Sequence, residues 1–492
     1  MRQFVRSFFV LISLFLTVGA NAQTLQEIRE AQTLLIRADR NPGPVDGAWG
    51  RRTEAALVDF LAERGLEFEG ALTNEHLNLL RKAPEGPEFV RRAIGLRNTL
   101  PRILRDNRDQ PENEPVNVTA GRELAEWADP SPNLVTLRFY LSKYLNNIYN
   151  FQHFVAEPSE NPRSIAFKVT PNRYLSAQMN YTAMTSYLFY KDGAVIHDER
   201  SPESRFGDKV TDETGLWSNS VGKSMVSYLL AHAICEGHIG GVDTRLDDWP
   251  LIEDTVYDNQ RIRDIADMRA GDQKLVDNWK GLISSGRWYN TTSIGDFARN
   301  ELRGTKPAGQ EGKRPHNYSG LPTNILLNYV IHKLGDDFEN FMNRVFGDHV
   351  GVENRVLFFR NSGIKVEEGL GWYQFRASRY DYLRIAMTML EDWESGNCQG
   401  QYFRDILARA APKNRTGRVR YVSIDESLRY AGQFHAVYRG MENRNVLGMD
   451  GYGGQLILMD FDNASAIVVN SIHLDYDYYQ LVHRAIQNGK LP

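Results

Sequence analysis

The sequence predicts an α+β protein in which a small three-helix bundle precedes an antiparallel sheet flanked by helices. Three patterns predict this class: short helical segments near the N-terminus, β-rich runs both early and late in the remainder, and helical runs between those β-rich runs. A sheet with this order closes by pairing strands that are distant in sequence. The chain has 492 residues, 42% hydrophobic and 24% charged, so a fibrous or wholly disordered protein is excluded.

The charge and the cysteines exclude further classes of protein. The formal net charge of −4 gives no general attraction to nucleic acid or anionic lipid, so no nucleic-acid partner is expected. The two cysteines, Cys235 and Cys398, are too few for a disulfide-rich scaffold or a four-thiolate zinc site. The sequence leaves open whether they pair or remain separate buried thiols.

Residues 1–22 have the pattern of a secretory signal peptide. Arg2 and Arg6 precede the apolar run Phe8–Val18, and Ala20-Asn21-Ala22 is a small-residue cleavage pattern. The apolar run is short for a membrane span, and an uncleaved anchor is the alternative. We therefore expect a periplasmic or secreted protein with no membrane span after removal of the signal.

Residues 23–84 are expected to form the helical bundle. Helical patterns cover Leu25–Arg37, Arg52–Arg64 and Leu72–Leu80. The run Gly43–Ala56, GPVDGAWGRRTEAA, resembles the core of the peptidoglycan-binding-like domain. This resemblance implies a module that tethers the protein to the cell wall through peptidoglycan; a spacer bundle without a ligand is the alternative. Residues 85–135 are polar and punctuated by prolines, which is typical of a linker.

Residues 136–492 are expected to form the larger domain. Two β-rich runs flank Asp192-Gly193, which predicts a hairpin, and a long apolar helix is expected at Val221–Cys235. The other predicted elements are helices at Pro322–Leu334, Phe338–Val345, Tyr380–Trp393 and Tyr478–Ile486, and strands at Gln455–Met459 and Ala466–Ser471.

Candidate catalytic residues stand at the start of the long apolar helix. Ser220 and Lys223 are three residues apart, so on a helix they share a face and can hydrogen-bond. A serine hydroxyl needs a base to become a nucleophile, and burial at a helix N-terminus lowers the pKa of a lysine toward that role. The alternative is an N-cap serine beside a solvated lysine. The motifs of zinc peptidases, kinases and α/β-hydrolases are absent from the sequence.

The residues that follow make the pattern more specific. After Ser220-Val221-Gly222-Lys223-Ser224 come Glu236-Gly237-His238-Ile239, Leu246-Asp247-Asp248 and the segment Arg261–Gly271. This series resembles the penicillin-recognising serine hydrolase superfamily, in its class C β-lactamase, esterase and 6-aminohexanoate-dimer hydrolase-like branch. The resemblance implies a β-lactamase-like fold with an all-helical subdomain, and an acyl-enzyme formed on Ser220 with no metal and no organic cofactor.

The second motif of that family is matched by Tyr318-Ser319-Gly320, followed by Asn324. The resemblance implies that Tyr318 is the general base or proton shuttle beside Lys223, and that Asn324 lies at the substrate site. Gly320 stands where the family often has an asparagine that binds an acylamino side chain. Penicillin-like substrates are therefore not favoured.

The third motif is matched by Gly451–Gln455, GYGGQ. The resemblance implies that the backbone N–H groups of Gln455 and Ser220 form an oxyanion hole, with Gly454 and Tyr452 beside the substrate. Tyr452 stands where β-lactamases carry a cation. Trp372 and Tyr373 lie where the family often lines its pocket, although packing in the core explains them equally well.

The function that these residues favour is a secreted serine hydrolase of amidase, esterase or carboxypeptidase type. It is expected to act on a small-molecule or peptide substrate, near or on peptidoglycan. The alternative is a non-catalytic wall-binding or sensor protein that keeps a penicillin-binding fold. A true β-lactamase is the weaker enzyme hypothesis because of Gly320 and Tyr452.

Overall fold

The computed structural model describes residues 24–38, 40, 42, 48–83, 141, 152–206, 209–273, 293–361, 368–413 and 426–492. The predicted signal peptide (1–22) and the predicted linker (85–135) lie outside these residues. The chain divides into two compact units, Met1–Val90 and Arg91–Pro492, which we describe separately. No helix among the described residues is long and apolar enough to cross a membrane.

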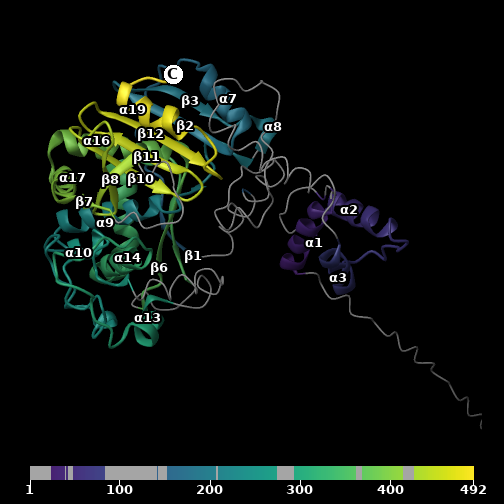
Figure 1. The fold of residues 1–492 in the computed structure, drawn as a ribbon, viewed down its shortest axis with the longest axis horizontal. Coiled ribbons are helices and arrows are strands. Elements are labelled where there is room, and N and C mark those ends of the chain that lie inside the picture. Colours follow the sequence, from purple (N-terminus) through teal and green to yellow (C-terminus); the bar gives the residue numbers. More distant parts are fainter. Residues whose placement is uncertain are drawn as a thin grey trace, which may run out of the picture. The chain divides into compact units, whose positions relative to one another are not determined.

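The N-terminal unit consists of three short helices, α1 (Leu25–Arg37), α2 (Arg51–Ala62) and α3 (Asn74–Lys82) (Figure 1). Their apolar faces meet in one core whose fully buried members include Leu35, Leu57 and Phe60. Helix α3 begins with a reciprocal pair of hydrogen bonds between Thr73 and His76, which satisfies two backbone N–H groups at its N-terminus. The predicted bundle is confirmed.

The second unit is built on an antiparallel sheet of eight strands in the order β3-β2-β12-β11-β10-β9-β8-β7. The strands are β2 (Met184–Lys191), β3 (Ala194–Arg200), β7 (Ala411–Pro412), β8 (Ser427–Ala431), β9 (Phe434–Tyr438), β10 (Val446–Gly451), β11 (Gln455–Asp460) and β12 (Ser465–Ser471). Strand β2 pairs with β12, from Tyr190 opposite Ala466 to Met184 opposite Ser471. The expected pairing of strands distant in sequence is therefore confirmed, and so is the α+β class.

Helices cover both faces of this sheet. Along β11, Leu456 and Leu458 pack into a core with α7 (Arg173–Tyr181) and α19 (Ala485–Asn488). The alternate residues Ile457 and Met459 pack into the main core instead. Because successive side chains of a strand point to opposite faces, a strand covered on both sides needs an unbroken apolar run, as β11 has from Leu456 to Met459.

The main core also contains α16 (Arg379–Ser395), α17 (Cys398–Arg409) and a helical region. The helical region comprises α10 (Ile262–Ala266), α13 (Ile294–Phe297), α14 (Leu321–Leu334), α15 (Phe338–Met342) and the π-helical turns Ala298–Leu302 and Asn343–Val350. Figure 1 shows α10, α13 and α14 gathered at the end of this unit away from the eight-stranded sheet. The expected helical subdomain is thus present.

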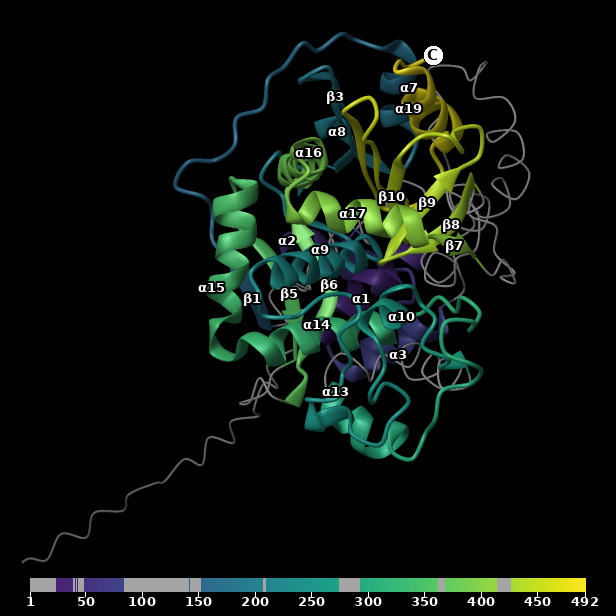
Figure 2. The ribbon, with the colours of Figure 1, turned by 90° about the vertical axis from the view of Figure 1, so that its left-hand side faces the viewer.

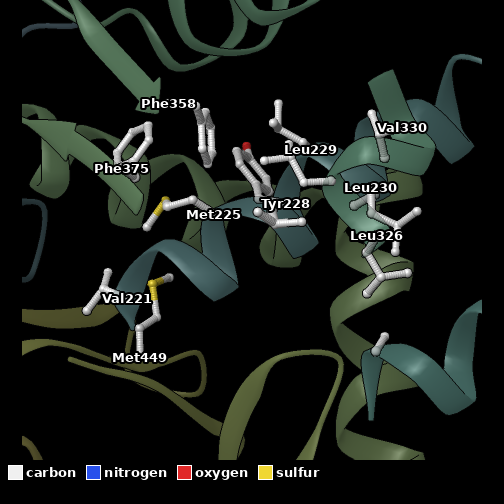
Figure 3. Packing of buried hydrophobic residues seen from close by; sticks show 14 of the residues in the cluster. Val221, Met225, Tyr228, Leu229, Leu230, Leu326, Val330, Phe358, Phe375 and Met449 are labelled. Atoms are coloured by element: carbon white, nitrogen blue, oxygen red, sulfur yellow. The ribbon is translucent and has the colours of Figure 1, made fainter. Parts of the chain in front are cut away.

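Helix α9 (Val221–Cys235) passes through the middle of this unit and is buried along nearly its whole length. It packs against α14, α17, β10 and β6, and Figure 2 shows it between α17 and α14. In Figure 3, Met225 and Tyr228 of α9 lie near Phe358 and Phe375, and Leu230 lies near Leu326. A helix that is apolar all round belongs in a core, which is why the sequence predicted its bounds so well.

A second sheet was not predicted from the sequence. It has the order β1-β5-β6-β4, with β1 (Gln152–Ala156), β4 (Leu216–Trp217), β5 (Val356–Arg360) and β6 (Gly371–Ala377). These strands are short and have no clean polar–apolar alternation, so their period gives little signal. Strand β6 packs directly on α9 and thereby reaches the predicted active site.

The cysteines form a disulfide between Cys235 at the end of α9 and Cys398 at the start of α17, with 5.8 Å between their Cα atoms. The sequence left open whether the two cysteines pair, and the structure shows that they do. The bond ties the helix that carries Ser220 to a neighbouring helix 163 residues further along the chain.

Candidate active site

Ser220 lies at the N-cap position of α9, at the end of a turn held from two sides. On one side Ser218 exchanges hydrogen bonds with the backbone of Phe375, since its N–H donates to the Phe375 carbonyl and its Oγ accepts from the Phe375 N–H. On the other side the Asn219 side chain donates to the carbonyl of Tyr452. Asn219 has a φ of +46°, a left-handed conformation uncommon outside glycine. Such a backbone persists only where its surroundings enforce it.

Lys223 donates a hydrogen bond to Ser220, with 2.8 Å between Nζ and Oγ. The side chain is buried, with 2% of the residue exposed, and among the described residues no carboxylate forms an ion pair with it. Burial lowers the pKa of Lys223, while the neighbouring Tyr318 opposes that shift. The ammonium lies 4.0 Å from the ring centre of Tyr373 and 4.8 Å from that of Tyr318. These ring faces compensate part of the lost hydration. The arrangement favours a lysine that can act as a base.

Tyr318 lies in the loop before α14, and its hydroxyl interacts with Ser220 and Lys223 by hydrogen bonding. The residue as a whole is 39% exposed, so it also forms part of the rim of the site. Loss of hydration raises the pKa of Tyr318, and the charge of Lys223 and the hydrogen bonding with Ser220 lower it. The structure thus brings together all three residues predicted to be catalytic.

Tyr373 of β6 is a fourth side chain at the nucleophile. Its hydroxyl interacts with Ser220 by hydrogen bonding, and burial raises its pKa to about 12. A β-carbon added at Gly320 would lie 2.8 Å from the Tyr373 ring, so the ring fills the space that a side chain at position 320 would need. Sequence reasoning placed Tyr373 near the pocket but did not assign it to the nucleophile. The glycine at position 320 was the available signal, because it leaves room for a ring.

Asn324 holds the backbone of Tyr373. Its side-chain oxygen accepts a hydrogen bond from the Tyr373 N–H at 3.0 Å, and only 1% of the residue is exposed. One helical turn further along α14, Asn328 makes two hydrogen bonds with the backbone of Gly371. The two asparagines thus fix β6 against α14, and the predicted place of Asn324 at the substrate site stays a prediction.

The glycine hairpin Gly451–Gln455 approaches the nucleophile only at its first two residues. A β-carbon on Gly451 would lie 2.5 Å from the Ser218 carbonyl oxygen, and the Tyr452 carbonyl accepts from Asn219. Gly454, with a φ of +87°, instead packs against Tyr476 and Leu474.

Gln455 pairs with Gly451 across this hairpin, and its side chain makes two hydrogen bonds with the backbone of Ser471. It lines a cavity with Trp217 and Ser471 that includes none of the three catalytic candidates. These contacts are made by the side chain of Gln455, so the role predicted for its backbone N–H stays a prediction, as does the place of Gly454 beside the substrate.

A group of aromatic rings and histidines packs around Tyr318. The ring centre of His435 lies 6.5 Å from that of Tyr318, and the ring centre of Tyr430 lies 5.9 Å from it. Burial lowers the pKa of His316 to about 4 and that of His435 well below its usual range, so both rings are neutral at pH 7. Neutral rings hold Tyr318 in place without adding a second charge near Lys223.

The N-terminal unit matches a known protein family. Residues 24–80 match the family described as "Putative peptidoglycan binding domain". That range covers the three helices of the bundle and the GPVDGAWGRRTEAA run. None of the curated proteins compared with the chain matches it.

The solved structures that resemble the chain include several hydrolases. A "Putative 6-aminohexanoate-dimer hydrolase from Bacillus anthracis" is 12% identical, with a TM-score of 0.49 over 76% of this chain and 96% of that chain. A class C beta-lactamase in complex with cefoxitin is 11% identical, with a TM-score of 0.43 over 62% of this chain and 94% of that chain.

"EstCE1, a hydrolase with promiscuous acyltransferase activity" is 13% identical, with a TM-score of 0.44 over 59% of this chain and 89% of that chain. These are the kinds of protein that the sequence motifs resemble, and the matches concern the fold alone.

Proposed function

We propose that this protein is a serine hydrolase that forms an acyl-enzyme on Ser220 and cleaves an amide or an ester. The observation that carries the proposal is the 2.8 Å contact between Ser220 Oγ and the Nζ of Lys223, a buried lysine whose pKa is lowered by burial. A lysine that paired with a carboxylate, or that faced water, would keep its proton and serve the serine poorly.

The chemistry follows from the contacts of Ser220. Its Oγ attacks the carbonyl carbon of the substrate, and its proton passes to unprotonated Lys223, with Tyr318 hydrogen-bonded to both residues as the second proton carrier. The tetrahedral intermediate then expels an amine or an alcohol, which takes up that proton. A water molecule attacks the resulting ester and loses its proton to the same pair. The pair returns this proton to Ser220 Oγ as the bond to the acyl group breaks and the acid is released.

The negative oxygen of the tetrahedral intermediate needs hydrogen-bond donors. We propose that the backbone N–H groups of Ser220, at the start of α9, and of Gln455 are these donors. The Tyr452 carbonyl accepts from Asn219 and so holds the hairpin beside the nucleophile turn. Removal of one such donor raises the barrier by about 3–4 kcal/mol.

The N-terminal bundle would hold the enzyme near the cell wall. The match of residues 24–80 to a peptidoglycan-binding family supports this role. The Cys235–Cys398 disulfide supports a periplasmic or secreted location, because such bonds persist in oxidising compartments. Peptidoglycan peptides or other amides and esters near the wall are the substrates we propose.

Active-site labelling tests the proposed function. The protein without residues 1–22 is treated with a fluorophosphonate and its intact mass is measured, beside Ser220→Ala and Ser224→Ala. Ser224 is a suitable control because it lies on the same helix but donates to the carbonyl of Gln433. We expect one adduct in the wild type and in Ser224→Ala, and none in Ser220→Ala. Failure of the wild type to react would leave a non-catalytic wall-binding protein as the better account.

A further inference from the structure

Three side chains converge on the oxygen of Ser220, from three different elements. Lys223 comes from α9, Tyr318 from the loop before α14, and Tyr373 from β6. Serine catalysis needs only a base and a proton carrier, and Lys223 with Tyr318 supply both. The second tyrosine is therefore not required by the mechanism proposed above, and its place at the nucleophile needs its own explanation.

The backbone of Tyr373 is fixed on both sides. Its N–H is held by Asn324, and its carbonyl oxygen lies 2.0 Å from the point where a β-carbon on Gly222 would stand. Strand β6 can come this close to α9 only because residue 222 has no side chain. The position of Tyr373 therefore depends on a particular glycine, one residue before Lys223, and on a particular asparagine, six residues after Tyr318.

The ring of Tyr373 is fixed as well. It lies against Lys223 on one side and against Gly320 on the other, where an added β-carbon would be 2.8 Å from Cε1 and 3.3 Å from the hydroxyl oxygen. Any larger residue at position 320 would have to displace it. Gly320 and Tyr373 thus share one space beside the nucleophile, and the tyrosine fills it.

We propose that Tyr373 is a specificity-determining residue that donates a hydrogen bond at Ser220 and whose ring limits the site to acyl donors that are compact at the carbon next to the scissile carbonyl. This inference rests on the proposed function. Once Ser220 is acylated, the carbonyl carbon is one bond from Oγ, so the substituents of the next carbon must avoid Lys223, Tyr318 and the Tyr373 ring. A straight acyl chain leaves by the open side of the site, whereas a branched carbon contacts the ring.

The chemistry of the two tyrosines supports this division of roles. The charge of Lys223 and hydrogen bonding with both Ser220 and Lys223 lower the pKa of Tyr318, whereas only hydrogen bonding with Ser220 lowers that of Tyr373. Tyr373 therefore keeps its proton throughout and remains a donor. Pairs of titratable groups with unequal environments commonly divide acid and base roles in this way.

The test compares a compact and a branched acyl donor, p-nitrophenyl acetate and p-nitrophenyl pivalate, in wild type, Tyr373→Phe and Tyr373→Ala. Tyr373→Phe keeps the ring and loses the donor, so we expect both esters to slow by on the order of 100-fold with the ratio of their kcat/KM values unchanged. Tyr373→Ala opens the space, so we expect the preference for acetate over pivalate to fall at least tenfold. Tyr479→Phe, on an exposed tyrosine, is the control and should match the wild type.

A second pair of variants keeps the test independent of the folding of Tyr373→Ala. In the wild-type background, Gly320→Ala should slow hydrolysis of the esters, because the new methyl group displaces the ring of Tyr373. In the Tyr373→Ala background, the same substitution should leave the rate unchanged. Gly320 has a φ of −85°, which alanine adopts freely, so only the contact with the ring is at stake.

Two results would overturn the inference: rates in Tyr373→Phe within twofold of wild type, or an unchanged acetate preference in Tyr373→Ala. Fluorophosphonate labelling of Ser220 is measured in the same variants. Labelling with an unchanged preference refutes the role of Tyr373 alone, whereas loss of labelling in the wild type refutes the proposed function and this inference together.

Discussion

Gly222→Ala should disable the enzyme while changing no catalytic group. The added β-carbon would stand 2.0 Å from the Tyr373 carbonyl oxygen and 2.8 Å from Ser218 Oγ. Normal contact requires at least 3.0 Å, so the backbone of β6 must move by about 1 Å or α9 must shift by as much. Misplacement of this size costs about 100-fold in rate.

The effect on stability is expected to be smaller. Overpacking costs about 1–3 kcal/mol, and the better helix propensity of alanine returns about 1 kcal/mol. We therefore expect a free energy of unfolding lowered by about 0–2 kcal/mol together with about 100-fold slower fluorophosphonate labelling of Ser220. Gly215→Ala is the matched control, because no atom lies within 4 Å of its added β-carbon and its φ is not in the left-handed range.

Urea unfolding measures the free energy of unfolding, and the time course of fluorophosphonate labelling measures the reactivity of Ser220. If Gly222→Ala is labelled at the wild-type rate, β6 is not held against α9 as described. This result would refute the account of how Tyr373 is positioned. An equally slow labelling of Gly215→Ala would show that the rate falls for any added methyl group in this part of the chain, and not because of the contact with Tyr373.

Three further predictions concern the base and the disulfide. Lys223→Arg keeps a positive charge that cannot be lost, so labelling of Ser220 should slow by about 10²–10⁴-fold, and near-normal labelling would rule out Lys223 as the base. Because burial lowers the pKa of Lys223, the folded protein holds this proton less tightly than the unfolded chain. Burial of Lys223 therefore lowers the free energy of unfolding by its full amount when the pH is below the pKa of the folded state, and this loss disappears as the pH rises toward 10.5. Lys223→Met should accordingly raise the melting temperature more at pH 7 than at pH 10. Replacing Cys235 and Cys398 together by alanine should lower the free energy of unfolding by about 2–5 kcal/mol while Ser220 remains reactive, and no loss would show that the bond does not stabilise the fold.

The sequence predicted elements whose pattern follows from burial alone. Helix α9 was expected at its observed bounds, Val221–Cys235, because a long apolar run that ends before Gly237 is typical of a buried helix. The pairing of β2 with β12 followed from the order of the patterns. Strands β5 and β6 were missed because five and seven residues without alternation resemble any short buried segment.

The candidate site was predicted unevenly for a similar reason. Ser220 and Lys223 are close along one helix, so their spacing was enough to bring them together. The position of Tyr373 depends on where β6 crosses α9, which local spacing cannot show. The role of the Gln455 backbone N–H was assigned from its motif and stays a prediction, since the hydrogen bonds to Ser471 are made by its side chain. Positions set by tertiary contacts, rather than by periodicity along an element, were those the sequence could not assign.

The central claim, an acyl-enzyme on Ser220, is tested most directly by trapping that intermediate. Wild type and Ser220→Ala are mixed with p-nitrophenyl acetate, quenched in acid within seconds and analysed by intact mass and peptide mapping. The account predicts one acetyl group on the peptide that contains Ser220 and a matching burst of p-nitrophenol, with neither in Ser220→Ala. Turnover that persists in Ser220→Ala, or acetylation at another residue, would contradict it.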